Sequence, residues 1–214
     1  MIVLGIDASL TCTGFALIES SGVPGRERVL VTGRFPTTTQ RPEVERRAVI
    51  CQAVRAWIEG YAPDLVGLEM PYVDPTKSMK VAVQLAALGG QLEQELATLG
   101  CIMVKVYPAS RQKALGVKGR GRGGPQITRS ELKDRLQEAV WDRYGIVVPE
   151  DEVDAIGVAM AAVTIHDRKQ REATQERLGL PQRGYGRRKE CLPSSPRRKA
   201  AAMPQDAGQG GLPL

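Results

Sequence analysis

Four acidic side chains lie on otherwise apolar segments that are far apart in the sequence. Asp7 lies within the apolar run 2–18, and Glu69 ends a second apolar run. Asp151 and Asp154 open a third apolar segment, which has helical character. Because an unpaired carboxylate inside an apolar sheet costs several kcal/mol, a bound cation is a common partner for such groups. Three separated acidic sites therefore suggest one shared cation site.

The spacing of these residues also indicates which reaction such a site could catalyse. Asp151 and Asp154 are three residues apart, so they share one face of a helix, whose N-terminus stabilises anionic groups. Oxygen-rich sites suit Mg²⁺ or Mn²⁺. Two such ions about 4 Å apart can hold the attacking water and the leaving oxygen of a phosphodiester. Taken singly, Asp151 fits a helix cap better than a metal ligand, and Glu69 fits a strand-end residue equally well, so the prediction rests on the whole set.

The elements that must position these carboxylates follow the order βββαβαβα, with two further helices. Three antiparallel strands followed by two βα units predict an α/β fold, with a mixed five-stranded sheet and helices on both faces. The first strand can then lie centrally, beside the strand that ends in Glu69. We expect strands at 2–8, 13–20, 28–35, 64–69 and 101–106, and helices at 42–60, 76–99, 109–115, 128–144 and 150–166.

The expected helix 76–99 is apolar nearly all round between Met79 and Leu88. A helix of this kind usually has cover on two sides. One side can be its own sheet and the other a second subunit, or the helix is sandwiched inside one domain.

Composition excludes several classes of protein. A length of 214 residues with 42% hydrophobic residues favours one domain plus appendages. No apolar run is long enough to span a membrane, and no secretory signal opens the chain. The four cysteines lack CxxC spacing, and His166 is the only histidine, so a zinc site is not expected. Reduced thiols instead indicate a cytoplasmic protein.

The formal charge of +6 is unevenly distributed. Residues 168–214 contain 11 basic and 4 acidic residues, whereas residues 1–167 have a net charge of −1. Within that neutral part, residues 105–129 contain seven basic residues and no acid. This pattern favours a nucleic-acid partner, although a solvated loop and a solubilising tail would give it too. We expect a nuclease domain at 1–167 and a basic, Pro/Gly-rich, disordered tail at 168–214.

The motifs together resemble one known family over about residues 1–166. Gly5-Ile-Asp7 with Thr13-Gly14, Leu68-Glu69 with Tyr72, and Asp151-x-x-Asp154-Ala155 are similar to RuvC-type Holliday-junction resolvases of the RNase H-like superfamily. The resemblance implies that the four carboxylates bind two Mg²⁺ ions, with Mn²⁺ as a substitute. It also implies a homodimer that resolves four-way DNA junctions by paired symmetric nicks, leaving 5′-phosphate and 3′-hydroxyl ends. A branch-migration motor is a further partner that this reading allows.

The same resemblance suggests residues that contact DNA. Tyr72 falls where the family carries an aromatic that stacks on bases, although a packed core tyrosine is the alternative. Lys113 matches a lysine close to the scissile phosphate, and a plain surface lysine is its alternative. The family's second lysine follows a short glycine loop, which is longer and richer in arginine here. The predicted DNA contacts are therefore Tyr72, Arg111, Lys113, Lys118, Arg120, Arg122 and Arg129.

Three other functions fit parts of the sequence. Residues 5–14 also look like the first phosphate loop of actin-like sugar kinases, but no second glycine-rich phosphate loop is found. The sequence does not distinguish a resolvase from a nuclease of the same fold that acts on RNA or on other branched DNA. A non-catalytic nucleic-acid-binding protein would gain nothing from carboxylates that face phosphates.

Overall fold

The computed structural model describes residues 1–23, 25–71, 78–118 and 127–179. Its centre is a mixed five-stranded sheet in the order β3-β2-β1-β4-β5. β1, β2 and β3 pair antiparallel, whereas β4 and β5 continue the sheet parallel to β1. The predicted fold class and the central position of the first strand are confirmed. The strands are β1 (Ile2–Asp7), β2 (Cys12–Glu19), β3 (Arg28–Pro36), β4 (Leu65–Glu69) and β5 (Met103–Val106).

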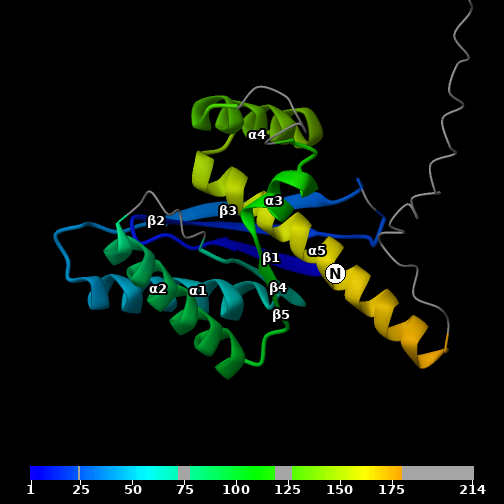
Figure 1. Ribbon diagram of the computed structural model, residues 1–214, viewed down its shortest axis with the longest axis horizontal. Helices are drawn as coiled ribbons and strands as arrows, with labels where there is room; N and C mark the ends of the chain where they lie inside the picture. Colours follow the sequence, from blue (N-terminus) through cyan, green and yellow to red (C-terminus); the bar gives the residue numbers. More distant parts are fainter. Residues whose placement is uncertain (24, 72–77, 119–126, 180–214) are drawn as a thin grey trace, which may run out of the picture.

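Helices cover both faces of this sheet (Figure 1). Two of them, α1 and α2, pack on one face, and the others lie on the opposite face, where α5 crosses the strands. The helices that follow β3 and β4 therefore cover one face, and the three helices that follow β5 cover the other. The helices are α1 (Glu43–Tyr61), α2 (Met79–Thr98), α3 (Pro108–Ala114), α4 (Arg129–Tyr144) and α5 (Glu150–Arg177).

Successive residues of the central strands alternate between two hydrophobic cores. In β1, Leu4 and Ile6 belong to the core under α1 and α2, whereas Val3 belongs to the core under α5. Because both faces are buried, the central strands are continuously apolar in sequence. Alternation places Gly5 and Asp7 on the same face as Val3, the face that α5 covers.

α5 lies unusually close to β1 and β2 because two strand positions on that face are glycines. A Cβ atom on Gly5 would lie 2.1 Å from the carbonyl oxygen of Ala155. A Cβ atom on Gly14, the cross-strand partner of Asp7, would lie 1.9 Å from the carbonyl oxygen of Asp151. Only glycine fits at such distances, so the sequence of these strands fixes where the N-terminal end of α5 lies.

α5 continues to Arg177, well past the helix end expected at 166. The prediction of disorder from residue 168 onward is therefore wrong for 168–177, whereas 180–214 lie outside the described residues. This outer part of the helix lacks an apolar face, which is why periodicity missed it. Its stability comes from local contacts, including the ion pair between Arg168 and Glu172, one helical turn apart.

α4 begins as the sequence predicts. The Thr128 hydroxyl accepts a hydrogen bond from the Glu131 backbone N–H, and the Glu131 carboxylate accepts one from the Thr128 backbone N–H. This reciprocal arrangement is a capping box, worth about 1 kcal/mol for the Thr128 cap alone. It fixes the start of α4, where Arg129 is the first helical residue.

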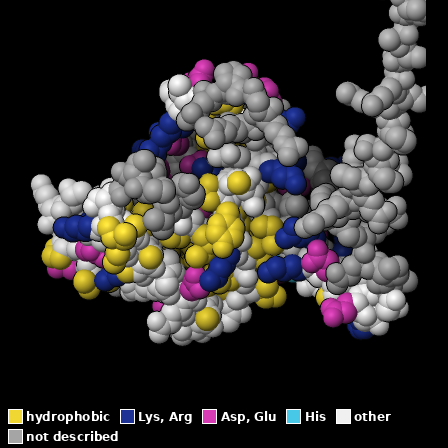
Figure 2. Space-filling model, in the orientation of Figure 1, with side chains coloured by type: hydrophobic (Ala, Val, Ile, Leu, Met, Phe, Trp, Pro, Cys, Tyr) yellow, Lys and Arg dark blue, Asp and Glu magenta, His cyan; other side chains and the backbone are white. Residues whose placement is uncertain are grey.

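α2 is buried along one face only. Leu88, Leu92 and Leu96 lie in the core shared with α1. At its N-terminal end Met79 and Val83 are 74% and 60% exposed. Figure 2 shows hydrophobic side chains gathered over this end of the helix. Within the described residues, the helix is therefore not sandwiched inside its own domain.

None of the helices in the described residues combines the length and the apolar character that crossing a membrane requires.

Candidate metal-dependent active site

Neighbouring parallel strands place Asp7 and Glu69 side by side. Ile6 pairs with Leu68 in the register of β1 and β4, so the next residue of each strand is acidic. Both acidic residues lie on the sheet face that α5 covers, and their carboxyl groups are close enough for the charge of Glu69 to raise the pKa of Asp7. The expected meeting of these two side chains is confirmed.

The first turns of α5 bring Asp151 and Asp154 to the same edge of the sheet. Arg111 of α3 connects the groups, since its Nη1 atom lies 2.8 Å from Oε2 of Glu69 and 2.7 Å from Oδ2 of Asp154. The side chains in these two ion pairs are only 10–14% exposed. One guanidinium thus joins an acidic strand end to the helix that crosses it.

Asp151 lies on the β2 side of this cluster. Its carboxylate lies close to the thiol of Cys12, the first residue of β2. Burial, followed by this nearby carboxylate, raises the pKa of the Cys12 thiol to about 11. The thiol is therefore protonated at neutral pH and adds no negative charge beside Asp151.

Burial dominates the protonation of the other three acids. It raises the pKa of Asp7 well above the ordinary range, and the nearby carboxylate of Glu69 raises it further. Burial also raises the pKa of Glu69, although Arg111 opposes the shift. The pKa of Asp154 is raised to about 7 by burial, again against Arg111. A single guanidinium is not enough positive charge for this set of carboxylates.

The donor set fits a hard divalent cation, although the side chains are not arranged around one. Among the described residues, no group of three or more His, Cys, Asp or Glu is positioned to hold a metal ion. However, Oδ1 of Asp154 is buried and has no hydrogen-bond partner in the part of the chain described. Buried polar atoms are nearly always paired, so an orphaned carboxylate oxygen among other carboxylates indicates a missing partner. Mg²⁺ and Mn²⁺ prefer such oxygen ligands.

A small pocket of about 90 Å³ connects this cluster to α4. Asp154 and Arg111 line it on one side, and Arg129 and Lys133 on the other, with Glu150 between them. Arg129, another predicted DNA contact, thus lines the same pocket as Asp154. Lys118 is exposed and does not line this pocket. Tyr72, Arg120 and Arg122 lie outside the described residues.

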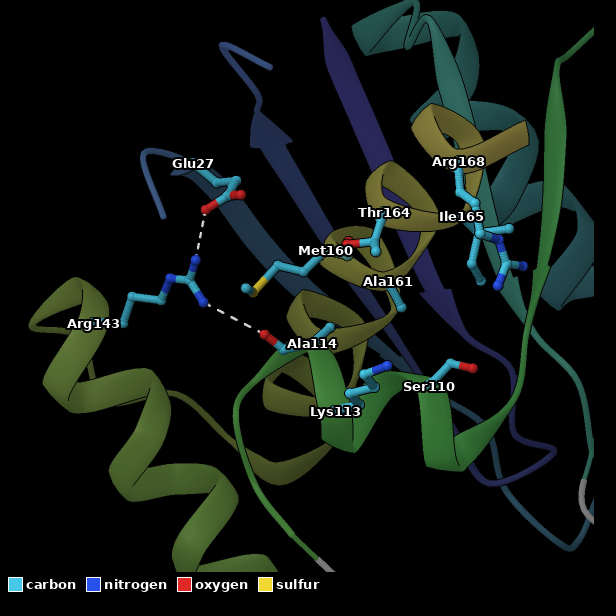
Figure 3. A pocket seen from close by; sticks show the side chains of 10 residues that line it. All are labelled: Glu27, Ser110, Lys113, Ala114, Arg143, Met160, Ala161, Thr164, Ile165 and Arg168. Atoms are coloured by element: carbon cyan, nitrogen blue, oxygen red, sulfur yellow. Dashed lines mark hydrogen bonds and ion pairs between the residues drawn. The ribbon is translucent and has the colours of Figure 1, made fainter. Parts of the chain in front are cut away.

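Lys113 lines a different pocket, of about 270 Å³, between α3, α4 and α5 (Figure 3). Its neighbours there are Ser110 on α3, Arg143 on α4, and Thr164 and Arg168 on α5. Thr164 is roughly 15 Å along the helix axis from Asp154, at 1.5 Å per residue. The structure therefore places Lys113 beside other cations, and not within the carboxylate cluster.

Sequence reasoning missed the role of Arg111. We predicted a DNA contact, but the side chain is buried against Glu69 and Asp154. The sequence feature that could have shown this is the spacing of Arg111 from Lys113, because residues two apart on a helix point to different sides. If Lys113 faces the pocket shared with Arg168, Arg111 has to face elsewhere.

The raised pKa of Asp154 predicts how stability depends on pH in the absence of metal. A carboxyl group whose pKa rises from 3.8 to about 7 on folding keeps a proton that the unfolded chain releases. The free energy of unfolding in EDTA should therefore fall as the pH rises from about 4 to about 7. Asp7 and Glu69 act in the same direction. Urea unfolding of the wild type and of Asp154→Asn at about pH 5 and pH 8 measures the effect.

Because Asn carries no proton to lose, Asp154→Asn should show a pH-dependent loss smaller by about 2 kcal/mol. Asp134→Asn, on the exposed surface of α4, is the matched control and should behave like the wild type. An equal loss in Asp154→Asn and the wild type would show that Asp154 titrates as an ordinary carboxylate.

The chain is similar in sequence to one family over most of its length. The family model described as crossover junction endodeoxyribonuclease RuvC matches residues 3–162. A curated relative with that name from Synechococcus sp. (strain WH7803) is 29% identical over 164 residues, which are 75% of this chain and 96% of the relative. Another from Trichlorobacter lovleyi is 30% identical over 165 residues, covering 76% of this chain and 85% of the relative.

Solved structures share the fold. The Thermus thermophilus RuvC structure in complex with a Holliday junction substrate matches with a TM-score of 0.60 and 19% identity, over 84% of this chain and 97% of that one. The yeast mitochondrial Holliday junction resolvase matches with a TM-score of 0.54 and 12% identity, over 83% and 84% of the two chains.

Proposed function

This chain belongs to the RuvC family of crossover junction endodeoxyribonucleases, and from this premise we propose that it resolves four-way DNA junctions by metal-dependent hydrolysis of phosphodiesters. The observation that carries the proposal is the meeting of Asp7, Glu69 and the first turns of α5 at one edge of the sheet. These residues are the same ones that match the acidic motifs of the family in the sequence.

The carboxylates of Asp7, Glu69, Asp151 and Asp154 would hold two Mg²⁺ ions, which supply an activated water and stabilise the leaving oxygen. The residues of the chain provide the arrangement. β1 and β4 hold two carboxylates at fixed register, and α5 brings the others. The neutral thiol of Cys12 lies beside Asp151 and adds no charge to the cluster. The orphaned Oδ1 of Asp154 supports the metal assignment, because it lacks any protein donor among the described residues.

Basic residues around this cluster would bind the DNA backbone. Arg129 is best placed to act as the second cation near the cut, because it lines the same pocket as Asp154. Lys113, Arg143 and Arg168 line the larger pocket further along α5 and would contact phosphates away from the cut. Such contacts do not depend on base sequence and weaken as the salt concentration rises.

Cleavage mapping on synthetic DNA tests this function. Four-way junctions, flaps, replication forks and linear duplexes, each labelled on every strand in turn, are incubated with Mg²⁺ and with EDTA. We expect paired, symmetric nicks on two opposing strands of the four-way junction and none in EDTA. Preferential cutting of flaps or forks would instead indicate that the protein acts on another branched DNA.

We also propose that the chain acts as a homodimer whose contact includes the N-terminal end of α2. Met79 and Val83, one turn apart on the same side of the helix, are exposed there although they are apolar. Paired cuts need two active sites, and a four-way junction has two-fold symmetry that a symmetric dimer matches.

A charge within this patch should separate the dimer. Val83→Glu places an unpaired carboxylate in the contact twice, once from each copy, and should weaken dimerisation at least about 100-fold. Val147→Glu is the matched control, since Val147 is 75% exposed in the segment before α5. Light scattering during gel filtration measures the mass. A wild-type monomer, or equal masses for both variants, would contradict this contact.

A further inference from the structure

The guanidinium of Arg111 lies among the carboxylates that the proposed function assigns to metal ions. Its Nη1 atom alone contacts both Glu69 and Asp154. A positive group held this closely between two buried carboxylates offsets their repulsion much as a divalent ion would. The lack of any arranged metal site among the described residues agrees with this, because the carboxylates are gathered around Arg111.

The arrangement is incomplete in a way that a permanent ion pair would not be. Nε of Arg111 is buried and has no hydrogen-bond partner in the described part of the chain, and the same is true of Oδ1 of Asp154. These two atoms belong to the same ion pair, one as a donor and the other as an acceptor. A hydrogen bond between them would remove the cost of burying each one without a partner. The site is therefore not optimised for the guanidinium alone.

The surroundings give the guanidinium room to leave. Arg111 borders the pocket of about 90 Å³ that lies between α3, α4 and α5. Glu150, on the same pocket, is 45% exposed and pairs with Lys133 of α4, and its carboxylate can accept hydrogen bonds from a second cation. The first part of the Arg111 side chain is fixed, since its Cγ atom packs against α5 at Gly157. Only the outer end of the side chain has to move.

We propose that Arg111 is an internal counter-ion, which stabilises the metal-free carboxylate cluster and must be displaced when a divalent cation binds. This inference rests on the proposed function, because it assumes that the cluster is the metal site. Arg111 therefore lowers the affinity of the free protein for metal and keeps the metal-free fold stable. It is a positioning residue, because it acts through Glu69 and Asp154.

The test compares Mn²⁺ binding by the wild type and by Arg111→Met in the absence of DNA. Met keeps the methylene contact with Gly157 and removes the charge. The amount of free Mn²⁺, measured by electron paramagnetic resonance, gives the dissociation constant. We expect Arg111→Met to bind Mn²⁺ at least about tenfold more tightly than the wild type. Arg171→Gln, which removes an exposed arginine from the outer part of α5, controls for net charge and should bind as the wild type does.

Thermal unfolding provides the second readout. In EDTA, Arg111→Met should melt at a lower temperature than the wild type, because its carboxylates have lost their counter-ion. Saturating Mn²⁺ should largely remove this difference. A purely structural arginine would lower the melting temperature equally under both conditions. A variant that folds only when Mn²⁺ is added supports the proposal, and one that folds under neither condition contradicts it.

The outcomes distinguish the role of Arg111 from the existence of the metal site. If the wild type and Arg111→Met bind Mn²⁺ equally, or the variant binds more weakly, Arg111 does not compete and the inference fails while the metal site stands. If neither protein binds Mn²⁺ at millimolar concentration, the inference and the metal-dependent function both fail.

Discussion

Replacing Asp7 by Asn should abolish cleavage of a four-way junction in Mg²⁺ and leave junction binding in EDTA intact. Asp7 lies at the centre of the cluster, beside Glu69 on β4 and close to Arg111 and Asp151. Asn keeps the shape of the side chain and removes the negative charge that a divalent ion needs. We expect the cleavage rate to fall at least about 1,000-fold, which corresponds to about 4 kcal/mol of transition-state stabilisation.

The same substitution should not unfold the protein. Burial already raises the pKa of Asp7 strongly, so the folded chain without metal favours a neutral group at this position. Asp7→Asn should therefore be at least as stable as the wild type in EDTA at neutral pH. Asp134→Asn again serves as the control and should cut at the wild-type rate. Cutting by Asp7→Asn at that rate would exclude the carboxylate cluster as the catalytic site.

Replacing Gly14 by Ala should cause the largest loss of stability among single methyl additions and should also disturb the site. The new Cβ atom would lie 1.9 Å from the Asp151 carbonyl oxygen and 2.5 Å from its carbonyl carbon. Both are backbone atoms, so α5 has to move away from β2. We expect a loss of about 2–4 kcal/mol in the free energy of unfolding. Because Asp151 moves with the helix, cleavage should fall even where the variant remains folded.

Gly60→Ala is the matched control for this experiment. Gly60 lies in α1, and a Cβ atom there meets nothing within 4 Å. Alanine is favoured over glycine inside a helix, so this variant should gain roughly 0.5–1 kcal/mol. Urea unfolding measures both variants. Equal stabilities for Gly14→Ala and the wild type would mean that α5 does not lie against β2 as described.

The sequence predicted the fold well because its strands carry strong local signals. The antiparallel start, the two βα units and the central place of the first strand follow from continuous apolar runs separated by turn residues. The Thr128 capping box was readable for the same reason, since its two residues are three apart. The end of α5 was missed because the helix beyond residue 166 has no apolar face. Hydrophobic periodicity does not detect a helix of this kind.

The site was only partly readable for a different reason. Acidic residues on apolar strands stand out in a sequence, so Asp7 and Glu69 could be named and their contact foreseen. Arg111 could not be placed, because its partners come from β4 and α5, distant in sequence. The close approach of α5 depends on Gly14, and a glycine in a strand does not reveal which element lies over it.

We propose that carboxylates from β1, β4 and α5 form one divalent-cation site. The most direct test is a crystal of the wild-type protein soaked in Mn²⁺ and measured for anomalous scattering. Anomalous density between Asp7, Glu69 and Asp154, with the Arg111 guanidinium displaced from them, is the result that we predict. Fully ordered side chains with no anomalous density among them, in a crystal that binds Mn²⁺ elsewhere or not at all, would contradict the account.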